Sequence, residues 1–152
     1  MIELNQNFRF NKNNYMARKN TKLKESAAKN IKKLLISRDE IIFAYLHGSF
    51  LDNFNFEDID VALYIDQEKI NYKQAFDYCF QLSSELSGQI GFEVDIQIMN
   101  YAPLGFKHSV LKNGTLLFSK DENLRLDLIE STSREYMDFY ELALQYIRDI
   151  AL

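Results

Sequence analysis

The chain has 152 residues, of which 47% are hydrophobic and 26% charged, a composition typical of a globular domain and not of a disordered or fibrous chain. Its longest apolar run, residues 41–46, is far shorter than the roughly 20 residues that a transmembrane helix requires, and its first residues do not resemble a signal peptide. A single cysteine, Cys79, excludes an internal disulfide and a cysteine-rich zinc site, so we expect a cytoplasmic protein with no membrane partner.

The net charge of −4 is unevenly distributed along the chain. Residues 1–40 contain 10 Lys and Arg against 4 Asp and Glu, whereas residues 41–152 contain 8 against 18. The acidic majority argues against binding of duplex DNA, which needs a broad basic surface. The basic segment is either a solvated helix face or a contact surface for RNA or an acidic partner, and the residues alone leave both interpretations open.

Hydrophobic periodicity predicts alternating helices and strands. Residues 1–20 are rich in asparagine and lack a clear period, so we expect a loosely ordered arm before a domain that spans residues 21–152. That domain opens with a helix capped by Thr21. The later elements are a strand at 41–47, a single-turn or irregular segment at 50–56, a strand at 58–65, a helix at 71–86, a strand at 92–99, a helix at 102–113, a strand at 115–118 and a helix at 121–150. This order predicts an α+β fold, with a small sheet flanked by helices and a long C-terminal helix.

The strand at 58–65 carries two carboxylates on one face. Asp58 and Asp60 are two residues apart, so their side chains point the same way, opposite to the apolar Ile59 and Val61. Neighbouring carboxylates repel each other and lose hydration unless a cation compensates them, and Mg²⁺ is the hard ion that such oxygens prefer. The alternative is that both residues lie at the exposed start of the strand.

A third carboxylate, Asp95, lies in the middle of the strand at 92–99. If that strand neighbours the strand at 58–65, the carboxylates of Asp58, Asp60 and Asp95 can converge on one patch. Three carboxylates can hold two Mg²⁺ ions, which is the arrangement that catalyses in-line displacement at phosphorus. The alternative is that Asp95 is an outward-facing residue of a half-solvated sheet.

A Gly48-Ser49 pair follows the apolar strand at 41–47. Glycine lets a phosphate approach the backbone closely, and the neighbouring amides and the serine hydroxyl can donate hydrogen bonds to it. A Gly-Ser pair is more often only a turn, but its position shortly before the Asp58-Ile59-Asp60 strand favours a phosphate site. His47 either contacts the same ligand or is a structural residue at the strand end, and His108 is expected at the surface.

The order of strand, Gly48-Ser49, short spacer, Asp58-Ile59-Asp60 strand, helix and third acidic strand resembles the polymerase-beta-type nucleotidyltransferases, and most closely their minimal nucleotidyltransferase branch. The segments 93–100, 102–104 and 110–121 look like those of the adenylyltransferase antitoxins that accompany HEPN-domain toxins. The resemblance covers roughly residues 21–150 and implies the polymerase-beta-like fold.

The resemblance also implies an activity, namely Mg²⁺-dependent transfer of AMP from ATP to a tyrosine hydroxyl of a partner HEPN-domain toxin. In family terms, Asp58 and Asp60 would bind both Mg²⁺ ions, and Asp95 would help hold the catalytic ion and activate the acceptor. Gly48 and Ser49 would hold the triphosphate.

The chain departs from the family pattern after Ser49. The spacer at 50–57 is slightly shorter than usual, and Leu51-Asp52-Asn53 replaces the usual small-Arg-Gly stretch, so the loop carries Asp52 in place of a basic residue. Two alternatives therefore stay open. One is a nucleotidyltransferase for small molecules such as antibiotics, with its acceptor pocket in the acidic part of the chain. The other is an antitoxin that neutralises its toxin by binding alone.

Overall fold

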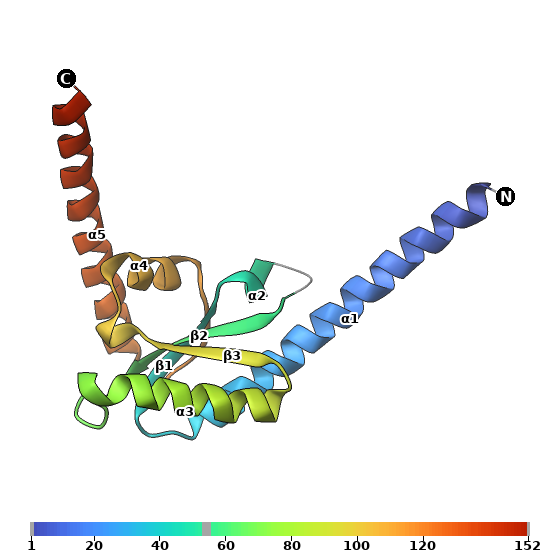
Figure 1. Cartoon of the computed structure of the whole chain (residues 1–152), viewed down its shortest axis with the longest axis horizontal. Helices are drawn as coiled ribbons and strands as arrows, with labels where there is room; N and C mark the ends of the chain where they lie inside the picture. Colours follow the sequence, from blue (N-terminus) through green and yellow to red (C-terminus); the bar gives the residue numbers. More distant parts are fainter. Residues whose placement is uncertain (1, 53–55, 152) are drawn as a thin grey trace.

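The computed structural model describes the backbone of residues 2–52 and 56–151 and the side chains of residues 18–51 and 56–151. It confirms the α+β fold and the predicted strands to within two residues at each end. The elements, in chain order, are α1 (Ile2–Ile36), β1 (Ile41–His47), α2 (Ser49–Asp52), β2 (Asp58–Ile65), α3 (Tyr72–Ile90), β3 (Glu93–Ile98), the 3-10 turn η1 (Met99–Tyr101), α4 (Leu104–Asn113), β4 (Thr115–Ser119) and α5 (Glu122–Ala151) (Figure 1).

The four strands form one mixed sheet in the order β3-β2-β1-β4. β1 runs antiparallel to both of its neighbours, whereas β2 and β3 run parallel. A parallel pair needs a crossover connection, and α3 supplies it. As a result, the end of β1 lies beside the start of β2, and the start of β2 lies beside the start of β3.

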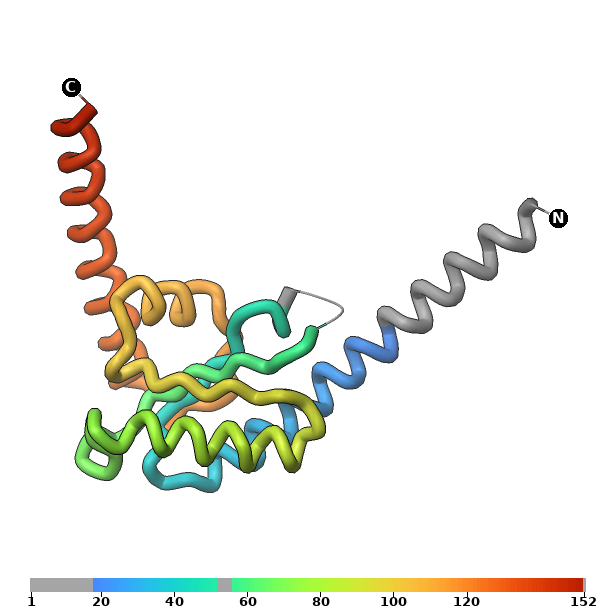
Figure 2. The backbone as a smooth tube through the Cα atoms, viewed as in Figure 1, coloured from blue at the N-terminus to red at the C-terminus, as the bar shows by residue number. Residues whose placement is uncertain are grey.

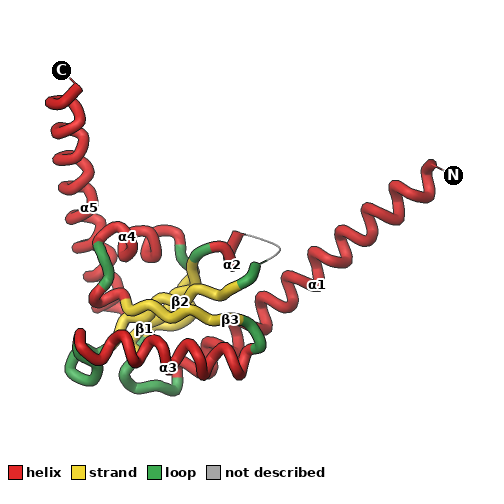
Figure 3. The backbone as a smooth tube through the Cα atoms, in the orientation of Figure 1, coloured by secondary structure: helices red, strands yellow, loops and turns green. Residues whose placement is uncertain are grey.

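Helices cover both faces of the sheet (Figure 3). On one face, α1 packs against β1 and β4 and α3 packs against β3, over one shared core. The buried residues of this core include Ala27, Ile31 and Leu35 of α1, Leu82 and Leu86 of α3, and Ile59, Val61, Leu63, Val94 and Ile96 of the strands. On the other face, Phe43, Tyr45, Ala62, Met99 and Val110 form a smaller core, against which Phe106 of α4 and Leu128 of α5 pack. The described residues contain no helix with the length and apolarity needed to cross a bilayer.

The two ends of α3 follow local rules, but one of them lies later than predicted. Asn71 caps the start, because its side chain accepts a hydrogen bond from the amide of Gln74 while the Gln74 side chain accepts one from the amide of Asn71. The predicted end at residue 86 is wrong. The helix ends at Gly91, whose φ of +81° is the left-handed conformation that glycine adopts at low cost.

The predicted start of the first helix is also wrong. α1 begins at Ile2 and not at Thr21, so the asparagine-rich segment is helical in the described backbone. Asparagine disfavours a helix by less than about 1 kcal/mol per residue, and no glycine or proline precedes Gly48 to interrupt α1. The division of the chain into an arm at 1–20 and a domain at 21–152 stays a prediction.

Two predicted apolar stripes are only partly buried. On α3, Phe76 and Phe80 are exposed while Leu82 and Leu86 are buried, so the helix has apolar side chains on two sides. On α5, Phe139 and Ile147 are exposed because the second half of this helix leaves the sheet (Figure 2). Periodicity reports that a helix has an apolar face, but not whether a neighbour covers that face.

We expect Leu86→Ala to lower the free energy of unfolding by about 2–5 kcal/mol, because Leu86 is completely buried between α3 and the sheet. Leu142→Ala is the matched control: the same atoms are removed from an exposed side chain of α5, so the expected change is below about 0.5 kcal/mol. Urea-induced unfolding of both variants measures the difference, and equal losses would contradict the described packing of α3.

Candidate active site

Three adjacent strands place a row of polar residues across one face of the sheet. Asp60 of β2 pairs with His47 of β1 on one side and with Asp95 of β3 on the other. Asp58 lies one step earlier on the same face and pairs with Glu93. The strand at 92–99 is therefore the neighbour that the sequence analysis required, and Asp58, Asp60 and Asp95 share one face.

Gly48 brings the Gly-Ser turn against this row. Its φ is +77°, and its carbonyl accepts a hydrogen bond from the amide of Leu51 at 3.2 Å, which opens the single turn α2. A Cβ atom at position 48 would collide with Oδ2 of Asp60, so only glycine leaves room for that carboxylate. Gly48 and Ser49 are both exposed. The turn and the carboxylates therefore line one accessible surface.

The environment of Asp60 disfavours its ionised form. Burial raises the pKa of Asp60 above its usual value, and the charges of Asp58 and Asp95 raise it further, while His47 opposes them. Burial also lowers the pKa of His47, although Asp60 and Asp95 act in the opposite direction. His47 is therefore a poor positive partner for the carboxylates at neutral pH, and it does not compensate their mutual repulsion.

The donor set fits a hard divalent cation. The described side chains contain no group of three His, Cys, Asp or Glu residues already drawn together as a metal cage. Their chemistry nevertheless suits Mg²⁺, because all three candidate ligands are carboxylates on one accessible face. A bound cation would also remove the repulsion that raises the pKa of Asp60.

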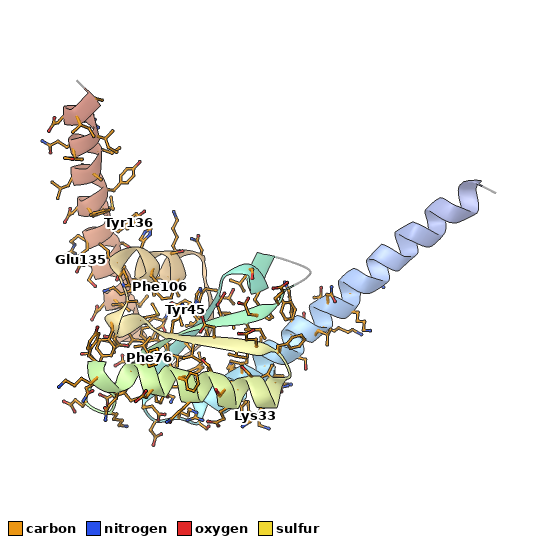
Figure 4. The ribbon with its side chains drawn as sticks, viewed as in Figure 1. Lys33, Tyr45, Phe76, Phe106, Glu135 and Tyr136 are labelled. Carbon is orange, nitrogen blue, oxygen red and sulfur yellow. The ribbon has the colours of Figure 1, made fainter. Side chains whose placement is uncertain are left out.

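Some residues of this face emerge only from the structure. The imidazole of His47 packs edge-on against Phe106 of α4, with ring centroids 5.3 Å apart. Its Nε2 atom is buried with no hydrogen-bond partner among the described residues. Phe106 is labelled in Figure 4. Glu93 lies beside Asp58, and the alternation of β3 was the signal for it. The side chain of Asp52, expected near the phosphate site, lies outside the described residues.

His108 has a structural contact. Its ring stacks on that of Tyr136 with centroids 3.7 Å apart and planes within 3°, which joins α4 to α5. Tyr136 is labelled in Figure 4. Cys79 is half-buried against the larger core, as expected of a small apolar residue.

Comparison with known families and structures points to one family. The family model described as polymerase beta, nucleotidyltransferase matches residues 29–123, which is more than half of the chain and includes every residue of the candidate site. No curated protein matches the sequence.

Several solved structures share the fold at low sequence identity. A chain of the MntA–HepT toxin–antitoxin complex is 19% identical with a TM-score of 0.64, and the match covers 84% of this chain and 99% of that one. A chain of the complex of a tri-AMPylated Shewanella oneidensis HEPN toxin with MNT antitoxin is 19% identical with a TM-score of 0.64. That match covers 85% of this chain and 99% of the other. A chain of a toxin–antitoxin structure with AMP-PNP is 19% identical with a TM-score of 0.64, and the match covers 82% of this chain and 98% of the other.

We expect Asp60→Asn to raise the midpoint of thermal unfolding of the metal-free protein at pH 7. A carboxyl group whose pKa is raised by folding destabilises the native state above its unfolded pKa, and the loss grows as the pH rises through the folded pKa. The difference should therefore vanish below about pH 4, where the carboxyl is protonated in both states.

Added Mg²⁺ should stabilise the wild-type protein more than the Asp60→Asn variant, because the variant lacks one ligand. Scanning calorimetry at both pH values, with and without Mg²⁺, measures these shifts. A metal-free variant that melts at or below the wild-type midpoint at pH 7 would contradict the described environment of Asp60.

We expect Gly48→Ala to destabilise the fold by about 1–3 kcal/mol, since alanine resists the left-handed conformation and its Cβ displaces the Asp60 carboxylate. Gly88→Ala is the control, because a Cβ there meets no atom within 4 Å, and alanine in a helix is favoured over glycine by about 0.5–1 kcal/mol. The two substitutions should shift the guanidinium unfolding midpoint in opposite directions; a shift of the same sign would show that the Gly48 turn is not as described.

Proposed function

Because this chain belongs to the polymerase beta nucleotidyltransferase family, we propose that it transfers AMP from ATP to a tyrosine hydroxyl of a HEPN-domain toxin and thereby acts as the antitoxin. The observation that carries the proposal is the meeting of Asp58, Asp60 and Asp95 on one face, with Gly48 fitted against Asp60. The toxin as partner is supported by the fold shared with the MNT antitoxin of a tri-AMPylated HEPN toxin.

The carboxylates and the Gly-Ser turn would divide the binding of the nucleotide between them. Asp58, Asp60 and Asp95 would hold two Mg²⁺ ions, and Gly48 and Ser49 would donate hydrogen bonds to the triphosphate from the exposed turn. When bound, Mg²⁺ supplies charge neutralisation and polarisation of the phosphate oxygens. The nucleotide is supported by the AMP-PNP present in a structure of the same fold.

The transfer itself is a displacement at phosphorus. The acceptor oxygen forms a bond to the α-phosphorus, the bond from that phosphorus to the bridging oxygen of the β-phosphate breaks, and pyrophosphate leaves. Asp95 would receive the hydroxyl proton, and this role is supported by its exposure, since Asp58 and Asp60 are half-buried. Most of the rate enhancement in such a site comes from positioning and electrostatics.

Co-expression with the protein encoded by the adjacent gene tests this function. Intact-mass spectrometry of that partner should reveal whole increments of AMP when it is produced with the wild-type chain. The increments should disappear with the Asp58→Asn/Asp60→Asn variant, because both carboxylates of β2 then lose their charge. The matched control is Asp127→Asn/Asp149→Asn, which removes the same two charges from exposed positions of α5 and should leave the increments unchanged.

Other outcomes separate the alternatives. An unmodified partner that is neutralised by both the wild-type chain and the Asp58→Asn/Asp60→Asn variant would replace the proposal with inhibition by binding alone. An unmodified and unneutralised partner, together with AMP transfer to an aminoglycoside in vitro, would instead establish a small-molecule nucleotidyltransferase.

A further inference from the structure

A groove of about 650 Å³ runs between α3 and the free edge of β3. Its α3 wall includes Phe76, Cys79 and Phe80, and its β3 wall includes Asp95 and Gln97. The walls are mostly apolar. β3 lies at the edge of the sheet, where no further strand from the described part of the chain covers it. The groove is therefore an apolar surface next to the carboxylate row.

The aromatic residues of the α3 wall are unusually exposed. Phe76, labelled in Figure 4, has 79% of its surface accessible, and Phe80, one helical turn later in the sequence, has 68%. Exposed apolar side chains that gather in one place typically mark a site of interaction. Because most of their surface is exposed, they contribute little to the core, so they can be replaced without unfolding the chain.

The groove is continuous with the candidate active site through Asp95. This residue lines the groove and also pairs with Asp60 in the adjacent strand. The charge of Asp95 acts both in the carboxylate row and in the groove. In the row it adds to the burial that raises the pKa of Asp60. In the groove, burial and then the charge of Asp95 raise the pKa of Cys79 to about 11. A molecule in the groove would thus lie beside the third carboxylate.

The hydrogen bonds along β3 indicate how an occupant is recognised. The amides of Val94 and Ile96 already donate to the hydroxyls of Ser87 and Ser83, at 2.8 and 3.0 Å. These two donors are therefore not available to pair with an added strand. Oε1 of Gln97 is buried and finds no hydrogen-bond donor within residues 18–51 and 56–151. The groove therefore offers mainly apolar contacts, which suits an occupant recognised by its side chains.

We propose that this groove docks the acceptor segment of the partner toxin, with apolar side chains of that segment against Phe76 and Phe80 and its tyrosine hydroxyl beside Asp95. The inference rests on the proposed function, since the third carboxylate marks where an acceptor must arrive. A second copy of this chain fits less well, because Glu93 and Asp95 would bring like charges together in the interface.

Cys79 gives a direct probe of the groove, because it is the only cysteine of the chain and lies in the α3 wall. The probe is N-ethylmaleimide, with labelling of this chain followed by mass spectrometry at pH 8.5. Binding of the adjacent-gene protein should slow the labelling of Cys79 at least about tenfold. The Asp58→Asn/Asp60→Asn variant should show the same protection, since docking does not need transfer. A complex that labels at the free rate would overturn the proposal.

Substitutions in the groove test its role in the reaction. Phe76→Ala/Phe80→Ala, and separately Ser84→Trp, which fills the groove from an exposed position, should raise the KM for the partner at least about tenfold. The KM for ATP should stay within about twofold, because neither substitution touches the carboxylates or the Gly-Ser turn. Leu126→Ala, an exposed apolar residue outside the groove, is the matched control and should change neither constant.

The outcomes distinguish the groove from the function. Unchanged partner KM in both groove variants, with normal transfer, would overturn the groove and leave the function standing. Loss of partner binding in the groove variants, measured by titration calorimetry while the wild-type chain transfers no AMP, would keep the groove and reject the transfer. If light scattering finds the isolated chain dimeric and the Phe76→Ala/Phe80→Ala variant monomeric, the occupant is a second copy and the proposal fails.

Discussion

The parallel pairing of β2 with β3 is the constraint on which the candidate active site depends. It places Asp95 directly beside Asp60 at the spacing of neighbouring strands, roughly 4.8 Å, and it places Glu93 beside Asp58. Such a row of carboxylates is unfavourable in the chain by itself. Burial first, and then the charges of Asp58 and Asp95, raise the pKa of Asp60. The fold tolerates the repulsion because the opposite face of the same two strands, which carries Ile59 of β2 and Ile96 of β3, is completely or almost completely buried.

The crossover helix α3 serves this pairing in two ways. Its buried side, with Leu82 and Leu86, packs against β3, and its serines at 83 and 87 accept hydrogen bonds from backbone amides at the open edge of β3. Edge strands with free donors are prone to pairing with other chains, so these two hydrogen bonds protect the edge. The other side of α3 is apolar but uncovered, which leaves the groove beside Asp95.

The two long helices extend the body in different directions, and they differ in charge. α5 packs on the sheet only through its first half, where Arg125 donates to the hydroxyl of Tyr45 at 2.7 Å and Leu128 contacts the smaller core. Beyond Tyr136, its apolar side chains are exposed along the part of the helix that leaves the sheet (Figure 1). Only the first half of this helix therefore belongs to the core.

The sequence by itself determined the elements and the local chemistry of this protein. Alternation placed Asp58 and Asp60 on one face of β2, and the caps at Asn71 and Gly114 follow from residues close in the chain. What the tertiary structure decided was everything that depends on contacts distant in sequence. Several features depend on which strands and helices become neighbours. Asp95 adjoins Asp60, and Gly48 must lack a Cβ. His47 packs on Phe106, and Phe76 and Phe80 stay exposed. Periodicity defines the faces of an element, but burial of a face is a property of the pair that packs there, so it emerges only when the chain has folded.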